Sequence, residues 1–276
     1  MLPDARALDA ERALRDLFAG FGSALVAFSG GVDSAYLAWI AHDVLGDRAL
    51  AVTALSESYP AHHYDLALTL ARQAGFPHEV VHTHEIDRPE YRANPVNRCY
   101  YCKDELYTTL SALASARAID VVLDGNNADD RGDYRPGRQA AREHGVRSPL
   151  DEVGLTKAEI RELSRAAGMA TWDEPASACL SSRIPYDHEI TNEKLGMIEQ
   201  AEDALRALGF RVCRVRHHDT LARLELGRDE IARALDEGVR DQILSALRAV
   251  GYRQVAVDLQ GYRMGSLNEG IRLKPV

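Results

Sequence analysis

Short apolar runs alternate with longer helical stretches through the first half of the chain. Apolar runs bordered by glycine and polar residues indicate buried strands, whereas apolar positions repeated along one side of ten or more residues indicate helices. Strands are expected at residues 24–28, 49–55, 79–82 and 119–123, and helices at residues 11–18, 35–44, 63–74 and 101–116. This alternation predicts an α/β fold with a parallel sheet covered on both faces. In such sheets ligands bind beyond the carboxyl ends of the strands.

A second pattern begins near residues 183–193, where Pro185, Asp187 and Thr191 indicate a linker and then a helix cap. Beyond it we expect helices at residues 193–208 and 229–249 and strands at residues 211–216, 222–226 and 254–259. The chain is therefore expected to have two domains. Residues 1–186 form the parallel-sheet domain, and residues 187–276 form a smaller α+β domain for substrate binding or oligomer contacts.

The composition is that of an ordinary globular protein and changes the picture mainly through its charge. The 276 residues include 33 Lys and Arg against 42 Asp and Glu, a formal net charge of −9. This acidic balance argues against a surface that coats nucleic acid or anionic lipid. No apolar run approaches the roughly 20 residues of a membrane helix, and residues 1–15 lack the apolar core of a signal peptide. We therefore expect a cytoplasmic protein that binds neither nucleic acid nor membranes.

The most specific motif is S-G-G-V-D-S at residues 29–34, which follows a predicted strand and opens a predicted helix. Two adjacent glycines let backbone N–H groups approach an oxyanion closely, and the helix N-terminus adds its dipole. Ser29 and Ser34 supply hydroxyl groups. The segment lacks the Gly-Lys-Ser/Thr ending of a Walker A loop and the spacing of a dinucleotide-binding loop. The alternative is a tight turn with Asp33 in the first turn of the helix.

In this setting S-G-G-x-D-S resembles the PP-loop of the ATP pyrophosphatase superfamily, which includes NAD synthetase and tRNA sulfur-inserting enzymes. The resemblance implies a PP-loop (HUP-like) parallel sheet sandwiched by helices. It also implies that Ser29, Gly30, Gly31, Asp33 and Ser34 hold the pyrophosphate of ATP. Enzymes of this kind adenylate a substrate oxygen and release pyrophosphate, so that a nucleophile can then displace AMP.

Further segments resemble the LarE family of sulfur transferases, which mature the nickel-pincer nucleotide cofactor of lactate racemase. These segments are N-R-C-Y-Y-C-K at residues 97–103, D-G-N-N-A-D-D at 124–130, P-A-S-A-C-L-S-S-R at 175–183, R-V-R-H-H at 214–218 and G-Y-R at 261–263. The resemblance spans nearly the whole chain. It implies adenylation of a pyridinium carboxylate mononucleotide, followed by sulfur transfer to give a thiocarboxylate and AMP. It also implies a homo-oligomer.

Cys179 is the residue that we expect to carry the sulfur. A thiolate can attack an acyl-adenylate, and the Arg183 cation nearby in sequence favours the thiolate form. If the Cβ–S bond of the resulting thioester then breaks, Cys179 is consumed and becomes dehydroalanine. The alternative is a small buried hydrophobic residue, which is the commonest role of an unmodified cysteine.

Cys99 and Cys102 form a C-x-x-C motif that a mechanism consuming one cysteine does not need. Together with Cys179 they offer three thiolates, enough for a [4Fe–4S] cluster with one open iron, where a bound sulfide would supply the sulfur. Some LarE-like proteins carry this three-cysteine set, so the resemblance supports a cluster and, as a partner, a sulfide donor. We expect the cluster, with sacrificial transfer from Cys179 as the second interpretation. A zinc site with a fourth ligand and a redox disulfide are further alternatives.

Arg214 and Arg216 alternate along the predicted strand at residues 211–216, so both point in one direction, as a phosphate clamp requires. The resemblance implies that they hold the nucleotide phosphate of the substrate, and we include Arg183 in this group. A solvated basic strip is the alternative. Cys213 lies on the opposite face of the strand and is expected to be part of the packing.

Asp129 and Asp130 follow the end of a strand, at the edge where a ligand is expected. Two carboxylates there could bind a Mg²⁺ ion that bridges the ATP phosphates. The alternative is a loop in which these residues cap the next element. Gly125 and Asn126 are expected to line the nucleotide site.

Glu199 and Glu202, three positions apart on one helix face, are expected to be solvated rather than to bind a ligand.

Two other functions remain open beside a sulfur transferase acting on a small nucleotide. A tRNA thiolase also joins a PP-loop to cysteine pairs, but the net charge of −9 disfavours it. An adenine-nucleotide-binding module without turnover is the other, and the cysteines in the expected active-site loops disfavour that interpretation.

Overall fold

The chain folds into two compact units, and the second of them is assembled from two separate stretches of sequence. The structure, a computed structural model, describes residues 3–131, 136–175, 178–263 and 265–268. The first unit is built from Met1–Glu85 and Asn97–Ser177, and the second from Ile86–Val96 and Ala178–Leu273. The boundary expected at residues 186 and 187 falls inside the second unit.

Asn94 and Tyr91 hold the early stretch within the second unit. The side-chain amide of Asn94 donates to the carbonyl oxygens of Pro185, at 2.7 Å, and His188, at 3.1 Å. The hydroxyl of Tyr91 lies 2.6 Å from the Oγ of Ser181. Asn94 is 0% and Tyr91 1% exposed, so these contacts form inside the unit. A helix of one turn, α4 (Pro89–Arg92), carries Tyr91.

The first unit is an α/β fold around a parallel sheet, as the alternating pattern predicts. The four strands lie in the order β3-β2-β1-β4, and every neighbouring pair is parallel. Their bounds are β1 Ala24–Ala27, β2 Ala49–Leu55, β3 His78–His82 and β4 Val121–Leu123. The carboxyl ends of β1, β2 and β4 therefore open onto one edge of the sheet, where the loop after β1 lies.

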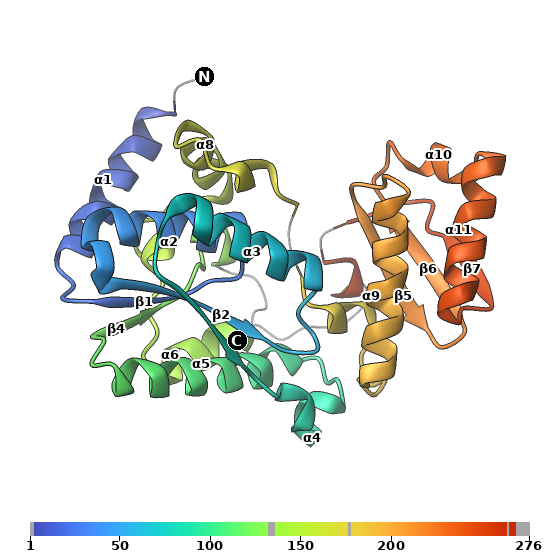
Figure 1. Cartoon of the computed structure of the whole chain (residues 1–276), viewed down its shortest axis with the longest axis horizontal. Helices are drawn as coiled ribbons and strands as arrows, with labels where there is room; N and C mark the ends of the chain where they lie inside the picture. Colours follow the sequence, from blue (N-terminus) through green and yellow to red (C-terminus); the bar gives the residue numbers. More distant parts are fainter. Residues whose placement is uncertain (1–2, 132–135, 176–177, 264, 269–276) are drawn as a thin grey trace. The chain divides into compact units, whose positions relative to one another are not determined.

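Helices cover both faces of this sheet (Figure 1). Neighbouring residues of β1 point to opposite faces, so Val26 packs into one core and Leu25 into the other. The helices on the Val26 face are α1 (Ala5–Ala19), α2 (Val32–Leu45), α3 (Ala61–Ala74) and α8 (Lys157–Ala166). Those on the Leu25 face are α5 (Arg98–Ala116) and α6 (Pro136–Glu143). The short helix α7 (Pro149–Glu152) contributes Leu150 to the core on the Val26 side.

The second unit packs helices against a small mixed sheet. Strand β5 (Cys213–His218) pairs antiparallel with β6 (Leu221–Leu226), which pairs parallel with β7 (Gln254–Val257). Helices α9 (Asn192–Ala207) and α11 (Glu237–Val250) supply the apolar cover. The stretch expected to be helical at residues 229–249 contains α10 (Ile231–Leu235) and α11, separated by Asp236, which has a non-helical ψ of 133°.

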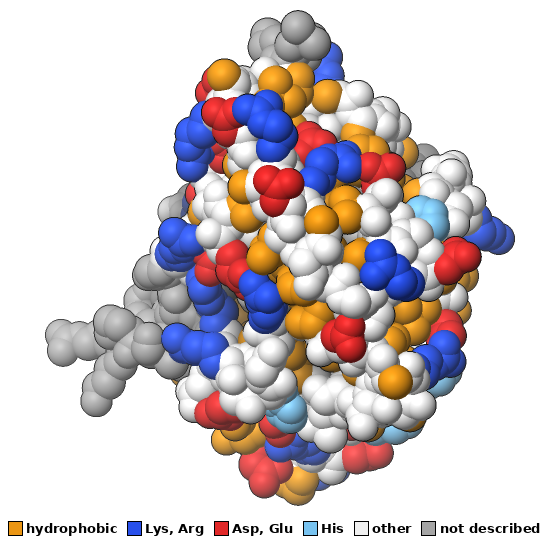
Figure 2. Space-filling model, turned by 90° about the vertical axis from the view of Figure 1, so that its left-hand side faces the viewer, with side chains coloured by type: hydrophobic (Ala, Val, Ile, Leu, Met, Phe, Trp, Pro, Cys, Tyr) orange, Lys and Arg blue, Asp and Glu red, His pale blue; other side chains and the backbone are white. Residues whose placement is uncertain are grey.

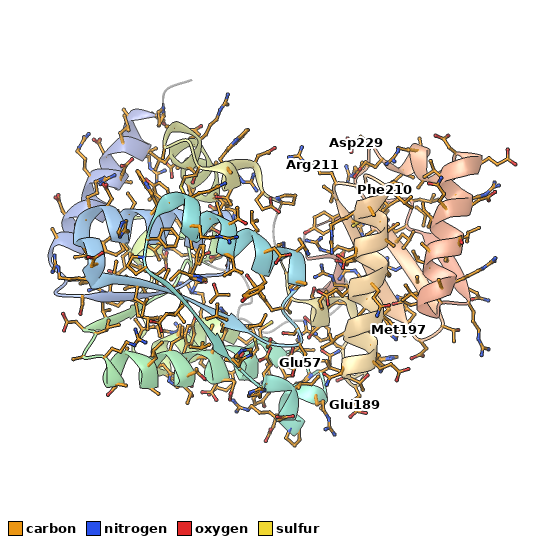
Figure 3. The ribbon with its side chains drawn as sticks, viewed as in Figure 1. Glu57, Glu189, Met197, Phe210, Arg211 and Asp229 are labelled. Carbon is orange, nitrogen blue, oxygen red and sulfur yellow. The ribbon has the colours of Figure 1, made fainter. Side chains whose placement is uncertain are left out.

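The segment just before β5 is hydrogen-bonded to the loop before α10. The carboxylate of Glu230 accepts hydrogen bonds from the backbone N–H groups of Arg211, at 2.8 Å, and Val212, at 3.1 Å. Figure 3 labels Arg211 and Asp229 at this end of the unit, and Met197 on α9. These backbone bonds hold the start of the strand that carries Arg214 and Arg216.

None of the helices in the described part of the chain is long and apolar enough to cross a membrane. On the face drawn in Figure 2, basic and acidic side chains are interspersed.

Candidate active site

The loop between β1 and α2 has the shape of an anion-binding turn. Gly30 has φ of +68°, and a Cβ there would lie 3.1 Å from the Cβ of Ala67 and 3.2 Å from its backbone nitrogen. A side chain at this position would be both strained and crowded. Gly31 is the N-cap of α2 and supplies no side-chain hydrogen bond. The first N–H groups of α2 thus receive no bond from a capping side chain, as an anion site requires.

Ser34 and Ser29 shape the loop from inside. The backbone N–H of Ser29 donates to the Oγ of Ser34 at 3.1 Å, and that Oγ donates to the carbonyl oxygen of Gly31 at 3.1 Å. Tyr59, after β2, donates its hydroxyl to the carbonyl oxygen of Ser29 at 2.8 Å. Ser34 is buried and Ser29 is exposed, so the two serines differ in what they can offer a ligand.

Asp33, in the first turn of α2, pairs with Lys157 at the start of α8. The Lys157 ammonium contacts Oδ2 of Asp33. The other oxygen, Oδ1, is buried and has no hydrogen-bond partner in the described ranges. Burial raises the pKa of Asp33, and the nearby Lys157 cation opposes part of that rise. A buried carboxylate oxygen without a partner is suited to a cation.

Lys157 is a site residue that the sequence reasoning missed. Its backbone N–H donates to Oδ2 of Asp129 at 2.8 Å, so it joins the loop after β4 to the loop after β1. A signal for it was present, because Thr156 and Glu159 form a capping box at the start of α8. The T-x-x-E spacing marks the helix start, and with it the position of the lysine.

Gly125 lies against the PP-loop helix. A Cβ at Gly125 would be 3.0 Å from the backbone nitrogen of Ser34 and 3.2 Å from its Cα. The preceding Asp124 is buried, and its carboxylate accepts hydrogen bonds from Tyr107 Oη at 2.8 Å and Asn126 Nδ2 at 2.6 Å. Gly125 therefore lies next to the loop after β1, whereas the Asn126 amide is turned towards Asp124. That these two residues line the nucleotide site stays a prediction.

Asp129 and Asp130 belong to a short 3₁₀ turn, Ala128–Asp130, that is capped by Asn127. Oδ2 of Asp130 accepts from the backbone N–H of Asn127 at 3.0 Å, and the Asn127 side chain accepts from the N–H of Asp129 at 3.0 Å. Asp129 is exposed and Asp130 buried. Among the described residues no group of three or more His, Cys, Asp or Glu is placed to hold a metal ion. The assignment of these two aspartates to Mg²⁺ stays a prediction.

Cys99 and Cys102 lie in the first turns of α5, three positions apart, so their side chains are neighbours on the helix surface. Cys99 is exposed, and Cys102 is half-buried. Farther along the same helix, Tyr107 makes the hydrogen bond to Asp124 described above. One helix thus carries the C-x-x-C pair and a contact to the end of β4.

In the second unit, Cys179 directly precedes a 3₁₀ turn, Leu180–Arg183. Arg183 is 0% exposed and forms a two-point ion pair with Glu202 of α9, at 2.8 Å and 2.9 Å. Its third nitrogen donates to the carbonyl oxygens of Ala178 at 2.7 Å and Cys179 at 2.9 Å. Residues 176–177, which belong to the same sequence segment, lie outside the described residues.

Arg214 and Arg216 are buried, at 9% and 6% exposure, and therefore do not form a solvated basic strip. Arg216 pairs with Glu225 at 2.7 Å and donates to the carbonyl oxygen of Ser182 at 2.6 Å. Its Nε is buried without a hydrogen-bond partner among the residues described. The Arg214 guanidinium lies over the ring of Tyr262, 5.2 Å from the centroid.

Two acidic residues in this unit, Glu202 and Glu225, are fully buried, which the sequence did not predict. Glu202 is 0% exposed, not solvated, because α9 turns it inward towards Arg183. Glu225, also 0% exposed, pairs with Arg216 and Arg223. Cys213 is 2% exposed within the apolar core, and burial raises the pKa of its thiol to about 11, which fits a packing residue.

Comparison with known proteins gives one family model and three relatives. The model of the NAD synthase family matches residues 13–94. An uncharacterized protein of Synechocystis sp. is 46% identical over 255 residues, which cover 92% of this chain and 95% of that protein. Pyridinium-3,5-bisthiocarboxylic acid mononucleotide synthase of Lactiplantibacillus plantarum is 36% identical over 245 residues, 88% of each chain. An uncharacterized protein of Methanocaldococcus jannaschii is 27% identical over 239 residues, 87% of this chain and 90% of that protein.

A parallel sheet with a Gly-Gly loop between β1 and α2, matched by the NAD synthase family, defines a PP-loop enzyme of the ATP pyrophosphatase class, which uses ATP and Mg²⁺. The similarity to the synthase extends over both units. The chain belongs to the LarE family.

Proposed function

We propose that the protein is an ATP-dependent sulfur transferase that converts a carboxylate of a pyridinium mononucleotide into a thiocarboxylate, in the biosynthesis of a nickel-pincer nucleotide. The observation that carries the proposal is the 36% identity to the synthase over 88% of each chain. The acidic net charge of −9 agrees with a small substrate rather than a tRNA.

The first step is adenylation. A carboxylate oxygen of the substrate attacks the α-phosphorus of ATP, forming an acyl-adenylate and releasing pyrophosphate. The N–H groups at the start of α2 and the exposed Ser29 hydroxyl are suited to hold the pyrophosphate. Lys157 adds a cation at this loop, and Oδ1 of Asp33, with the exposed Asp129, is suited to the Mg²⁺ that accompanies ATP.

The second step replaces AMP by sulfur, and Cys179 is the residue that we assign to it. Arg214 and Arg216 hold the nucleotide phosphate of the substrate in this proposal. Its support is that both guanidinium groups are buried in one unit with Cys179, and that the Nε of Arg216 lacks a partner in the described part of the chain. A buried, partly unsatisfied guanidinium is a strong anion ligand.

For the sulfur source we propose a [4Fe–4S] cluster held by Cys99, Cys102 and Cys179. Cys99 and Cys102 fit two ligand positions, because they are neighbours on the surface of one helix. Such a cluster, held by these three cysteines, would supply the sulfide that replaces AMP. In the competing route, the Cys179 thiolate attacks the acyl-adenylate and releases AMP. Loss of the Cα proton then breaks the Cβ–S bond, giving the thiocarboxylate and dehydroalanine.

Anaerobic purification followed by one reaction cycle tests both parts of the proposal. Iron and acid-labile sulfide are measured first, and the intact mass is measured after incubation with ATP and the pyridinium mononucleotide. Bound iron and sulfide, with an unchanged protein mass and a thiocarboxylate product, support the cluster. If no iron is bound and the protein mass falls by one H₂S, the sulfur comes from Cys179 itself and not from a cluster. Pyrophosphate release without any thiocarboxylate would contradict sulfur transfer altogether.

A further inference from the structure

Arg183 has no side-chain surface left for a ligand. Its relative exposure is 0%, and each of its three guanidinium nitrogens already donates a hydrogen bond. Nε and Nη2 donate to the two carboxylate oxygens of Glu202, at 2.8 Å and 2.9 Å. Nη1 donates to the carbonyl oxygens of Ala178 and Cys179 and to the Oγ of Ser182, at 2.7, 2.9 and 3.0 Å. A phosphate could reach this group only if an existing bond were broken.

Arg183 instead hydrogen-bonds the backbone at Ala178 and Cys179. The carbonyl oxygens of Ala178 and Cys179 both point at one nitrogen, so the guanidinium fixes the peptide groups on the C-terminal side of both residues. Glu202 in turn is anchored from a second direction, because its Oε1 accepts from the backbone N–H of Val215 at 3.0 Å. The Arg183–Glu202 pair thus links the Cys179 backbone to helix α9 and strand β5.

Two other contacts hold the next residues of the same segment. Tyr91 Oη lies 2.6 Å from the Oγ of Ser181, and Arg216 Nη1 lies 2.6 Å from the carbonyl oxygen of Ser182. Cys179 itself is only half-buried. An accessible thiol on a backbone that is held at Ala178, Cys179 and Ser182 is the arrangement that a reacting group needs, since a misplacement of 1 Å costs about 10²-fold in rate.

We propose that Arg183 and Glu202 are positioning residues: their ion pair fixes the backbone that presents the Cys179 thiol, and Arg183 does not bind the substrate phosphate. This inference rests on the proposed function in one respect, that Cys179 takes part in sulfur transfer. The geometry separates Arg183 from Arg214 and Arg216, which remain assigned to the phosphate.

A lysine exchange with a matched control tests the assignment. In Arg183→Lys a single ammonium keeps the charge beside Glu202 but cannot reproduce the planar fork that reaches both Glu202 and the two carbonyl groups. Arg206→Lys is the control, because Arg206 also contacts Glu202, at 3.6 Å, while its other ion pair is with Asp203 on its own helix. Both variants are made in the full-length chain, and their thermal unfolding is compared with that of the parent.

Three measurements follow on each variant: pyrophosphate exchange, kcat and KM for the mononucleotide, and the rate at which iodoacetamide alkylates Cys179 in protein prepared without iron. Arg183→Lys is expected to leave pyrophosphate exchange and KM unchanged, to lower kcat for transfer by roughly 10- to 100-fold, and to change the alkylation rate of Cys179 several-fold. Arg206→Lys is expected to match the parent in all three.

A rise in KM with unchanged kcat and alkylation would assign Arg183 to substrate binding and overturn the inference, as would equal effects of the two variants. If Arg183→Lys does not fold, Glu202→Asp decides the question: withdrawing the carboxylate by one methylene group should lower kcat and change alkylation in the same direction. The alkylation rate is measured without any turnover, so it tests the positioning of Cys179 independently of its role in catalysis. The role of Cys179 is tested separately: a Cys179→Ala protein that still transfers sulfur would contradict the proposed function without changing the alkylation result.

Discussion

The ammonium of Lys157 lies against the carboxylate of Asp33, 124 residues earlier in the chain. This pair joins the start of α8 to the first turn of α2, next to the loop that we assign to pyrophosphate. The cation and the anion compensate each other. In the proposed function, ATP with Mg²⁺ would offer each of them a partner of opposite charge.

Replacing Lys157 should therefore impair adenylation. Lys157→Ala removes a cation directed at the pyrophosphate loop, and we expect pyrophosphate exchange to fall by about 10²-fold. Lys157→Arg keeps the charge and should retain more activity than the alanine variant. Lys194→Ala, which removes a lysine that donates to a backbone carbonyl in the second unit, is the control. Equal exchange rates in Lys157→Ala and the parent would exclude a role for this lysine.

Gly125→Ala should weaken ATP binding, because the new methyl group would lie 3.0 Å from the Ser34 nitrogen and displace either loop. We expect a loss of roughly 10-fold or more in affinity, measured by calorimetry with ATP and Mg²⁺. The matched control is Gly196→Ala inside α9, where the nearest atom to a new Cβ is 3.9 Å away. That exchange should leave ATP binding unchanged and stabilise the helix by about 0.5–1 kcal/mol. An unaltered affinity in Gly125→Ala would show that the packing of this glycine does not shape the ATP site.

The Arg183–Glu202 pair should make stability depend on pH. Burial by itself raises the pKa of Glu202, but the Arg183 cation and the hydrogen bonds outweigh it and hold the pKa below the ordinary value of 4.5. The ionised group therefore contributes stability above pH 4.5, and this contribution is lost as the pH falls through the lower pKa of the folded state. Denaturant unfolding between neutral and acidic pH, compared between the parent and Glu202→Gln, measures it. Parallel curves for the two proteins would contradict the prediction.

The amount of bound iron should depend on Cys99, Cys102 and Cys179 but not on Cys213. Cys99→Ser, Cys102→Ser and Cys179→Ser are each expected to lose most of their iron and acid-labile sulfide after anaerobic purification. Cys213→Ala should retain both, because Cys213 is 2% exposed in the apolar core. Loss of iron in Cys99→Ser and Cys102→Ser with full retention in Cys179→Ser would remove Cys179 from the cluster.

The strands and the PP-loop were predictable because local signals mark them. The run from Ala24 to Phe28 is apolar, glycines border it, and Asp33 and Ser34 follow in a helical register. The capping box that begins α8 was equally local, so Lys157 was within reach of the same reasoning. Its partner was not, since no local pattern relates Lys157 to a carboxylate 124 residues away.

Glu202 shows where such reasoning fails. Its neighbours Leu195, Ile198, Ala201 and Leu205 give α9 an apolar side, and Glu202, seven positions after Leu195 and four after Ile198, lies within that side. A carboxylate is normally solvated, so the sequence alone does not predict its burial. The partners that make this burial favourable come from elsewhere in the chain: Arg183 in a separate 3₁₀ turn and the backbone N–H of Val215. The same holds for Glu225 and Arg216, which meet across two paired strands.

The two stretches of the second unit are synthesised at different times. Its first stretch, Ile86–Val96, leaves the ribosome well before the rest of the unit exists. Tyr91 can bond to Ser181 only after 90 more residues have been added to the chain. Until then Tyr91 and Ile86, which are both buried in the folded unit, lack most of the residues that cover them. A piece beginning at Ala178 would lack these residues permanently. The segment that presents Cys179 can therefore reach its final form only in a chain that has kept its own earlier part.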